Sequence, residues 1–513
     1  MVLARSNRDI DLKQAIGNYE FTLAPRALFA PNGAMLPCTD KSKLIHLLEK
    51  LGTAEPPDDD QQQLQDASGL QRDAVDSETM DFTHTEGDPN RKIALVDGMV
   101  VVQKLTKKPA TVVTVKDLSE CFNARLMSLT RDCDEIILVF DTYKADSLKS
   151  TTREKRRQGK DPVQYQIRDD TSIKHIPMIR FLSHDKTKAD LTEYLAARTL
   201  EYNKDSSKLV ITSASGHTRS NNELLFEDNN HEEADILLIH QAVLASQRNP
   251  PDAELVVFSP DTDVLVLVIA NYDLLLRKTS MSMASGVIQV QPVWKALGPE
   301  RAKALPAFHA FSGADNTGRF SRIGKATWLQ VYLKADGEVV KALQMLSDAT
   351  EVTDDLLSTL ATFVSAAYSP KDIQIASIPE LRWHLFCKHM AESDKLPPTP
   401  GALKQHILRV QIQATVWSQA SVAQQQFLDP LKHGFYKDTT GQVKPVTTEV
   451  LPAPKAIIEM VRCQCSADCS TARCSCRSKN LSCTDLCQCG TQCQNDEDSR
   501  NDILLASDSD DDE

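Results

Sequence analysis

Acidic residues follow the apolar segments KIALV, EIILVF and ELVVFSP of this chain, and further acids occur in HEEAD and SGAD. Carboxylates that gather at one place repel one another unless a divalent cation offsets their charge. Oxygen ligands without His or Cys favour Mg²⁺ or Mn²⁺, and two such ions can drive phosphodiester hydrolysis. A single acid after a strand more often caps a turn or a helix, so the chemistry depends on convergence. The candidate ligands are Asp97, Asp141, Glu233, Asp235, Asp261, Asp263 and Asp315.

A cysteine-rich segment near the C-terminus is the second candidate metal site. Nine of the thirteen cysteines lie there, with hardly any apolar residues between them, so either disulfides or metal thiolates must hold the segment together. The N-terminal sequence MVLARSNRDIDLK lacks the apolar stretch of a secretory signal, which predicts an intracellular protein and therefore metal. An odd number of cysteines also fits pairwise disulfides badly. The predicted zinc ligands are Cys463, Cys465, Cys469, Cys474, Cys476, Cys483, Cys487, Cys489 and Cys493.

The four other cysteines are scattered through the chain and are expected to be ordinary buried thiols. They are Cys38, Cys121, Cys133 and Cys387.

The hydrophobic pattern predicts the elements that position the acids. Short apolar runs, KIALVDG, EIILVFD, KLVIT and ELVVFSPDTDVLVLVI, alternate with helix-like stretches such as LTEYLAARTLEY and HEEADILLIHQAVLA. Buried runs separated by helices indicate a mostly parallel sheet in an α/β domain. Because ligands of such sheets bind beyond the carboxyl ends of the strands, we expect the acids to share one edge.

Helical periodicity continues beyond this domain, in residues 341–450. In ALKQHILRVQIQATVW the apolar residues recur at steps of three and four, which predicts one buried face of a helix. Weaker periodicity in LKQAI and KLIHLLEKLG predicts helices in residues 1–51. The expected buried face consists of Leu403, Ile407, Val410, Ala414 and Trp417.

Charge is distributed unevenly along the chain. The net charge is −13, but residues 54–90 hold eleven acids against Arg72 alone, and residues 496–513 hold nine against Arg500 alone. These acidic segments, poor in aromatic residues, are predicted to be a disordered linker (52–90) and a disordered tail (496–513). The rest of the chain is mildly basic, which permits a nucleic-acid partner. No apolar run is long enough to cross a membrane.

The acidic motifs resemble the PIN-like nuclease core of the flap-endonuclease superfamily. KIALVDG is similar to its first-strand motif, VFDTYKADSLKSTTREKRR to its second, HEEAD to its acidic helix and SPDTDVL to its D-x-D motif. SGADNTGRFSRIGKATW resembles the last aspartate followed by a duplex-binding helix-turn-helix. The sequence departs from the family where about ninety residues precede Asp97, and where Arg322 replaces the glycine that usually stands before the Ile of RIGKA.

This resemblance implies a nuclease site with two Mg²⁺ or Mn²⁺ ions held by the seven acids. It also implies that Lys149 and Arg156 contact the scissile phosphate, although their basic run would equally suit a solvated helix face or a nuclear import signal. The duplex-binding turn would use Arg322, Gly324 and Lys325.

The cysteine-rich segment resembles the tesmin-type CXC domain, most closely in RCSCRSKNLSCTDLCQC. This resemblance implies three Zn²⁺ ions, and nine thiolates can complete three tetrahedra only if some of them bridge. Some members of that family bind DNA, and here Arg473 stands where they carry a tyrosine that reads the minor groove. Arg477 and Lys479 are further candidates for DNA contact, while a purely structural or protein-binding module is the alternative.

The sequence as a whole predicts a nuclear, metal-dependent nuclease that a zinc module tethers to nucleic acid, with DNA favoured over RNA. It is similar to transposon-associated animal proteins that join these two modules. The alternative is a non-catalytic nucleic-acid or chromatin-binding protein that keeps the core as a scaffold. The expected domains are an N-terminal region (1–51), an acidic linker (52–90), a PIN-like domain (91–340), a helical extension (341–450), a CXC domain (455–495) and an acidic tail (496–513).

Overall fold

A computed structural model describes most of the chain, in two compact units that are each built from separate segments. Unit 1 comprises Met1–Ala34, Tyr368–Leu403 and Thr447–Glu513, and unit 2 comprises Met35–Ala367 and Lys404–Val446. The described residues are 11–53, 91–105, 112–142, 162–348, 351–370, 373–389, 392–454, 462–466, 468–479, 482–483, 487–489 and 493–495.

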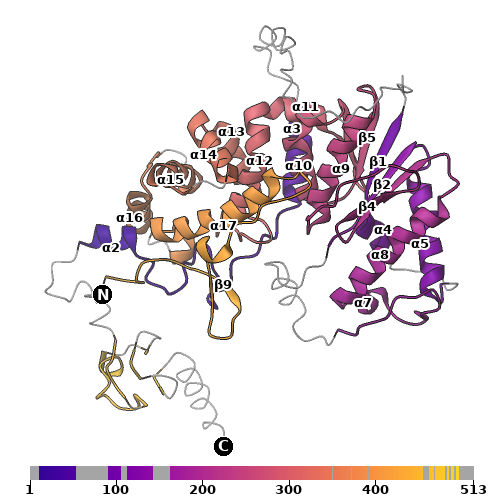
Figure 1. Cartoon of the computed structure of the whole chain (residues 1–513). Helices are drawn as coiled ribbons and strands as arrows, with labels where there is room; N and C mark the ends of the chain where they lie inside the picture. The colour runs from indigo at the N-terminus through magenta and orange to yellow at the C-terminus, as the bar shows by residue number, and fades with distance from the viewer. Residues whose placement is uncertain are drawn as a thin grey trace, which may run out of the picture. The chain divides into compact units, whose positions relative to one another are not determined.

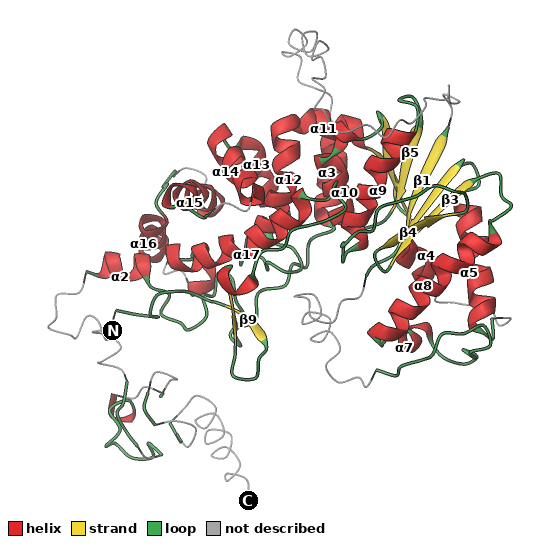
Figure 2. Ribbon diagram, in the orientation of Figure 1, coloured by secondary structure: helices red, strands yellow, loops and turns green. Residues whose placement is uncertain are grey.

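A seven-stranded sheet lies at the centre of unit 2 (Figures 1 and 2). Its order is β4-β3-β2-β1-β5-β6-β7, in which the five inner strands run parallel and the two edge strands, β4 and β7, pair antiparallel. The predicted α/β class with a mostly parallel sheet is therefore confirmed. The strands are β1 (Lys92–Asp97), β2 (Glu135–Val139), β3 (Leu209–Ala214), β4 (His217–Ser220), β5 (Glu254–Phe258), β6 (Lys278–Met283) and β7 (Gly286–Gln289).

The direction in which strands are added reverses at the centre of this sheet. From β1 the chain adds β2 and β3 on one side, and it then returns to add β5 and β6 on the other side. Such a switch point opens the crevice in which open α/β sheets bind their ligands. Asp97 ends β1, and Asp261 follows β5 within a short loop, so two of the predicted acids flank the switch point.

Helices cover both faces of the sheet (Figure 1). On one face, apolar side chains of β1, β2 and β3 form a single buried cluster with α4, α5, α7 and α8. On the other face α9 packs on β1 and β2, α10 packs on α9, and α12 packs on α10. These helices are α4 (Gly98–Lys104), α5 (Val115–Leu129), α7 (Met178–Phe181), α8 (Asp185–Tyr202), α9 (Ala234–Arg248), α10 (Thr262–Ala270) and α12 (Pro299–Ser312).

The apolar run DVLVLVI forms helix α10, which corrects the interpretation of residues 254–269 as one strand-like run. Only ELVVF is a strand, after which the Asp261 carboxylate accepts the N–H of Asp263 and caps the new helix. Residues 262–269 are all buried, so α10 is enclosed on every side. Packing of this kind overrides the weak helix propensity of β-branched residues.

The remaining helices include those predicted at the N-terminus and in the region 341–450. The predicted apolar face of α17 is buried throughout, as expected. Residues 435–437 and 443–445 pair as a separate two-stranded sheet, β8 (Phe435–Lys437) and β9 (Val443–Pro445). These helices are α2 (Leu12–Asn18), α3 (Lys43–Thr53), α11 (Val290–Leu297), α13 (Lys325–Lys334), α14 (Gly337–Met345), α15 (Asp354–Tyr368), α16 (Ile378–His389) and α17 (Pro400–Ser418).

The predicted N-terminal region (1–51) is divided between the two units. Residues 35–53 belong to unit 2, where α3 packs on α10, α11 and α13 and extends two residues into the predicted linker. The rest of that linker and the tail lie outside the described residues. The predicted helical extension (341–450) is divided as well, because residues 368–403 belong to unit 1.

Unit 1 is held together by contacts between α2 and α16. Gly17 lies against Pro379 so closely that a Cβ there would come within 2.9 Å of the proline Cβ. The buried guanidinium of Arg382 donates hydrogen bonds to the carbonyls of Ile16 and Tyr19, each at 3.0 Å. Within the described residues, no helix has both the length and the apolar composition needed to cross a membrane.

Candidate functional site

Three helix N-termini meet at the carboxyl edge of the sheet in unit 2. The Asp97 Oδ1 atom accepts an N–H of the first turn of α4 at 2.9 Å, and Asp261 Oδ1 accepts an N–H of α10 at 3.0 Å. Asp141 Oδ1 accepts the N–H of Ala234, the first residue of α9, at 2.8 Å. The positive ends of three helix dipoles therefore face carboxylates. The three aspartates therefore cap helices, which is one of the two roles that the sequence predicts for them. Each of these contacts uses one carboxylate oxygen, so the other oxygen is left to bind a metal ion.

The carboxylates of Asp235, Asp261 and Asp263 are the most closely grouped. Their potential ligand oxygens all lie within 4.8 Å of one another. Beside them, burial and then the negative charge of Asp141 raise the pKa of Asp97 to about 7. Crowding that disfavours the ionised form of a carboxyl is relieved by a nearby cation. The candidate ligand atoms are all carboxylate oxygens, and the raised pKa of Asp97 reflects burial and nearby negative charge. Such a site fits a hard divalent ion.

Glu233 and Asp315 lie at the same edge. Glu233 is buried and occupies the position directly before α9, next to the N–H that binds Asp141. Asp315 is itself exposed in the loop after α12, and its negative charge acts on Lys41, a residue that also contacts Asp261 and Asp263. All seven predicted acids thus gather at one edge of the sheet. We call this set of seven residues the acid centre.

Lys41 is a charged side chain that contacts the acid centre and that no sequence motif indicated. Its Nζ atom lies 3.0 Å from Asp261 Oδ1 and 2.6 Å from Asp263 Oδ2. Burial acts against the charge, but Asp263, Asp261 and Asp315 hold the pKa of Lys41 above its ordinary value. Because Lys41 precedes the linker and belongs to none of the motifs, only the folded chain reveals its position.

His309 supports Asp263 from the side opposite Lys41. Its Nε2 atom lies 2.7 Å from Asp263 Oδ1, and its Nδ1 atom accepts a hydrogen bond from Lys325 Nζ at 2.9 Å. Burial and the charge of Lys325 lower the pKa of His309 to about 4, so the ring is neutral at pH 7 and Nε2 carries the donated proton. Burial alone would raise the pKa of Asp263, but the hydrogen bond from His309 and the hydrogen bond and charge of Lys41 hold it below its ordinary range.

The predicted phosphate contact of Lys325 does not hold for its side chain. The side chain is buried, and its ammonium donates to the ring and carbonyl of His309 and to Ser312 Oγ. The backbone N–H of Lys325 is also engaged, because it donates to Asp40 Oδ2 at 2.9 Å. Asp40 therefore caps α13 at the amide that a phosphate would use, and the room it needs explains Gly324, where a Cβ would lie 2.8 Å from the same oxygen.

Arg322 differs from its two neighbours in the predicted duplex-binding turn, because its side chain is exposed. Its backbone adopts the left-handed conformation, with φ of 63°. Glycine adopts this conformation without penalty. This explains why the family that the sequence resembles usually has a glycine at this position. The predicted phosphate contacts Lys149 and Arg156 lie in the segment 143–161, outside the described residues.

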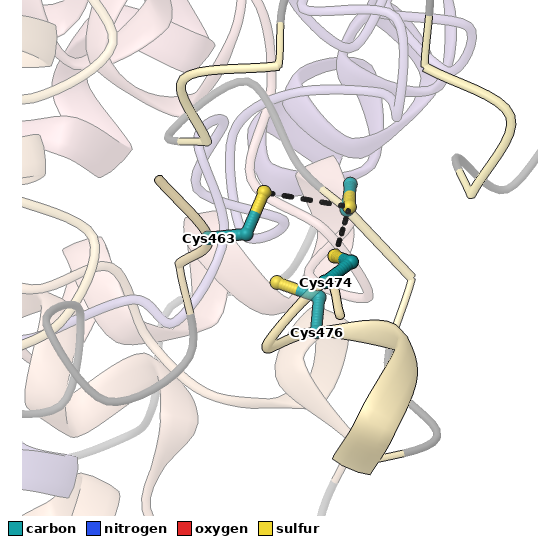
Figure 3. Close-up of side chains that lie close together, drawn as sticks. Cys463, Cys474 and Cys476 are labelled. Carbon is teal, nitrogen blue, oxygen red and sulfur yellow. Dashed lines mark hydrogen bonds between the residues drawn. The ribbon is translucent and has the colours of Figure 1, made fainter. Parts of the chain in front are cut away.

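The cysteine-rich segment brings its thiols into one cluster, which we call the cysteine module (Figure 3). Neighbouring Sγ atoms lie 3.6–3.9 Å apart, as in the pairs 463–469, 463–483, 474–483 and 476–487. A disulfide would need about 2.05 Å, whereas sulfurs at about 2.3 Å from a tetrahedral zinc ion are about 3.8 Å apart. The spacing fits metal thiolates and excludes disulfides at these pairs. Figure 3 shows Cys463, Cys474 and Cys476 with their sulfurs directed to a common region.

Three groups of four cysteines could each hold one metal ion, and they share members. Cys463 belongs to all three groups, while Cys469, Cys474 and Cys483 belong to two each. Sharing of this kind is what bridging thiolates require. Burial and then neighbouring thiols raise the pKa values of Cys476, Cys483 and Cys489, so in the absence of a cation the charged forms are disfavoured. The cysteine module therefore has the geometry of a multi-metal cluster, and a bound cation would favour the thiolate forms of these three cysteines.

Asn495 binds two cysteines of the module, and the spacing of the cysteines did not predict this contact. Its backbone N–H donates to Cys493 Sγ and its side-chain amide to Cys483 Sγ, both at 3.3 Å. Arg477, a predicted DNA contact, donates instead to the backbone carbonyl of Cys469 at 3.3 Å. Arg473 is exposed, as a DNA contact would need to be.

Lys479 lies in the short 3₁₀ helix Arg477–Lys479, and only its backbone is described. The four scattered cysteines differ from one another. Cys133 is buried as expected, Cys38 and Cys121 are half-buried, and Cys387 is exposed, which corrects the expectation for that thiol.

Comparison with known proteins gives structural matches only. No protein-family model and no curated protein sequence matches the chain. Matching solved structures include the bacteriophage T5 D15 flap endonuclease, in a pseudo-enzyme–product complex with DNA and metal ions, and the T5 D15 protein co-crystallised with metal ions. In both comparisons the identity is 12%, the TM-score is 0.30, and the match covers 64% of this chain and 97% of the other.

Proposed function

We propose that this chain is a divalent-metal-dependent nuclease whose acid centre hydrolyses phosphodiester bonds. The observation that carries the proposal is the gathering of acids from β1, β2, α9 and α10 at the switch point of the sheet. There Asp235, Asp261 and Asp263 place their potential ligand oxygens within 4.8 Å of one another. Open α/β sheets bind ligands at this position, and carboxylates are the ligands that Mg²⁺ and Mn²⁺ prefer.

The protein's part in this chemistry is to fix the oxygens. The first N–H of α9 holds Asp141, and the neutral His309 ring orients Asp263. Bound divalent ions would supply an activated water and stabilise the leaving oxygen. Seven carboxylates are enough for the two Mg²⁺ or Mn²⁺ ions that the flap-endonuclease resemblance implies. Lys149 and Arg156 stay the predicted phosphate contacts.

We also propose that the cysteine module is a zinc domain of the tesmin type that holds the nuclease on DNA in the nucleus. The shared cysteines and the sulfur spacing support three Zn²⁺ ions with bridging thiolates. Arg473, exposed between the clustered thiols, is the proposed DNA contact, while Arg477 supports the fold of the module. We further propose a functional similarity to the transposon-associated animal proteins that join these two modules.

One pair of contacts favours a second function, a non-catalytic nucleic-acid or chromatin-binding protein. Lys41 is ion-paired with Asp261 and Asp263, and Asp40 occupies the N-terminal amide of α13. Both contacts come from the chain itself and lie where a metal ion and a phosphate would otherwise bind. A protein that has lost catalysis could keep the acid centre as a salt-bridged scaffold.

A cleavage assay separates the two functions. Zinc-loaded full-length protein with Mn²⁺ is offered flap, hairpin and single-stranded DNA and RNA, beside the double variant Asp261→Asn/Asp263→Asn. We expect cleavage by the wild type and a loss in the double variant larger than the 10- to 100-fold that outer-shell substitutions typically cause. The exposed Asp273→Asn is the matched control and should cleave like the wild type.

Two results contradict the nuclease proposal. One is the absence of cleavage of every substrate, and the other is cleavage that survives the double substitution. Binding without cleavage that disappears when zinc is chelated would establish the non-catalytic function instead.

A further inference from the structure

Lys41 places a fixed positive charge among the carboxylates that should bind metal. We propose that Lys41 holds the second cation position of the acid centre from within the chain, so that one divalent ion binds while the ammonium stays in place. This inference rests on the proposed function only in requiring that the acid centre binds divalent metal. It changes the expected number of tightly bound ions from two to one.

Both oxygens of Asp263 are already engaged. Oδ2 lies 2.6 Å from Lys41 Nζ, and Oδ1 lies 2.7 Å from His309 Nε2. Asp261 shares the same ammonium through Oδ1 at 3.0 Å. A divalent ion on this side would have to displace Lys41, since two cations at the same oxygens repel each other strongly away from bulk water. Lys41 therefore takes the place that an ion bridging Asp261 and Asp263 would occupy.

The opposite side of the acid centre is built differently. Asp97 and Asp141 each accept a backbone N–H at a helix N-terminus. Within the described part of the chain neither forms an ion pair with a lysine or arginine, whereas Lys41 pairs with Asp261 and Asp263. The acid centre is thus asymmetric, with one side held by a lysine and the other left to an exchangeable ion.

Contacts of Lys41 and of the residues before and after it hold its backbone in place. Its carbonyl accepts hydrogen bonds from Thr262 Oγ1 at 3.3 Å and from the N–H of Leu44 at 3.1 Å. The preceding residue, Asp40, caps α13 through the N–H of Lys325. Helix α3, which begins two residues after Lys41, packs on α10, α11 and α13 of the same unit. The ammonium is therefore preorganised, as a resident cation must be to compete with a metal ion.

The test counts Mn²⁺ ions bound to zinc-loaded full-length protein, using the electron paramagnetic resonance signal of free Mn²⁺ together with titration calorimetry. Lys41→Met keeps the alkyl stem without the charge, and it should bind a second ion at least about 10-fold more tightly than the wild type does. Lys41→Arg keeps the charge and should bind one ion. Lys43→Met removes an exposed lysine from the same segment and is the matched control. Combining Lys41→Met with Asp263→Asn should remove the additional ion and so locate it.

The possible failures are distinguishable. Equal numbers and affinities of Mn²⁺ in the wild type and Lys41→Met overturn the role of Lys41 and leave the proposed nuclease intact. If neither protein binds Mn²⁺, the metal centre itself is wrong, and both proposals fall. An additional ion in Lys41→Met that survives Asp263→Asn also contradicts the assignment, because that ion would lie elsewhere.

Discussion

The acid centre and the cysteine module both gather metal-ligand side chains, but different forces position them. The acids stand at the ends of buried strands and at helix caps, so the apolar core of unit 2 fixes their places. In the cysteine module the described buried cluster consists of the cysteines themselves. A fold can thus set its ligands before any ion arrives, or it can depend on the ion for its structure. The two sites should therefore respond oppositely to loss of metal.

Removing zinc should have the largest effect, and it should be confined to the cysteine module. If zinc binds as proposed, thiolate–metal bonds replace an apolar core there, and a chelator should unfold the cysteine module as it unfolds other small zinc domains. The strands of unit 2 should keep their protection. Hydrogen–deuterium exchange by peptide measures both regions in one sample. If the cysteine peptides stayed protected after chelation, the module would not depend on metal for its fold. If β1 and β5 lost protection, the effect of zinc would not be confined to the module.

Substituting single cysteines should reveal which thiolates bridge. Cys463 belongs to all three candidate groups and Cys465 to one, so Cys463→Ser should lose more zinc than Cys465→Ser. Zinc content of purified protein, measured by mass spectrometry of the metal, checks this order. Equal losses would mean that the two thiolates play equivalent parts, and the shared position of Cys463 would be wrong.

A backbone substitution beside Asp97 should show that packing positions the acid centre. A Cβ at Gly98 would overlap the ring of Phe140, so Gly98→Ala should destabilise unit 2 by about 1–3 kcal/mol, the usual effect of overpacking. Gly337→Ala is the control, since a Cβ there meets nothing within 4 Å. Denaturant unfolding measures both free energies. Equal stability of the two variants would contradict the close packing behind Asp97.

The smallest effect is expected at Arg322, whose left-handed backbone favours glycine. Arg322→Gly should raise the free energy of unfolding by about 1 kcal/mol, because a residue with a Cβ is destabilised by roughly this amount in the left-handed conformation. If the arginine contacts phosphate, the same variant should weaken binding to DNA and lower its salt slope by about 1. Arg322→Lys keeps the charge and serves as the control. A less stable Arg322→Gly would show that the side chain supports the fold instead.

Sequence patterns identified β1, β2, β3 and β5, four of the five inner strands, because these strands are buried on both faces and consist of continuous apolar runs. They missed β4 and β6, where polar residues such as Thr218, Arg219, Thr279 and Ser280 interrupt the pattern. They also read α10 as strand, since an enclosed helix and a buried strand share the same apolar composition. The type and order of these elements were set by burial, which a single sequence shows only indirectly.

The sequence predicted those residues of the candidate site that lie close to a predicted strand or helix along the chain. Six of the seven acids end or follow a strand of the sheet or lie at the start of helix α9 or α10, and Asp315 lies in the loop after α12. Lys41 lies 222 residues before Asp263, and His309 lies 46 residues after it, so no local pattern could connect them. Lys325 failed as a phosphate contact for the same reason, because burial against His309 depends on contacts that only the fold creates.

The most direct test of the account measures both metals in one sample. The wild type, Asp97→Asn/Asp141→Asn (the acid variant) and Cys463→Ser are each dialysed against Zn²⁺ and Mn²⁺, and the bound metals are counted by mass spectrometry. We expect the acid variant to lose Mn²⁺ and keep all its zinc, and the cysteine variant to lose zinc and keep its Mn²⁺. If either substitution removed both metals, or if the acid variant kept its Mn²⁺, the division into two independent metal sites would be contradicted.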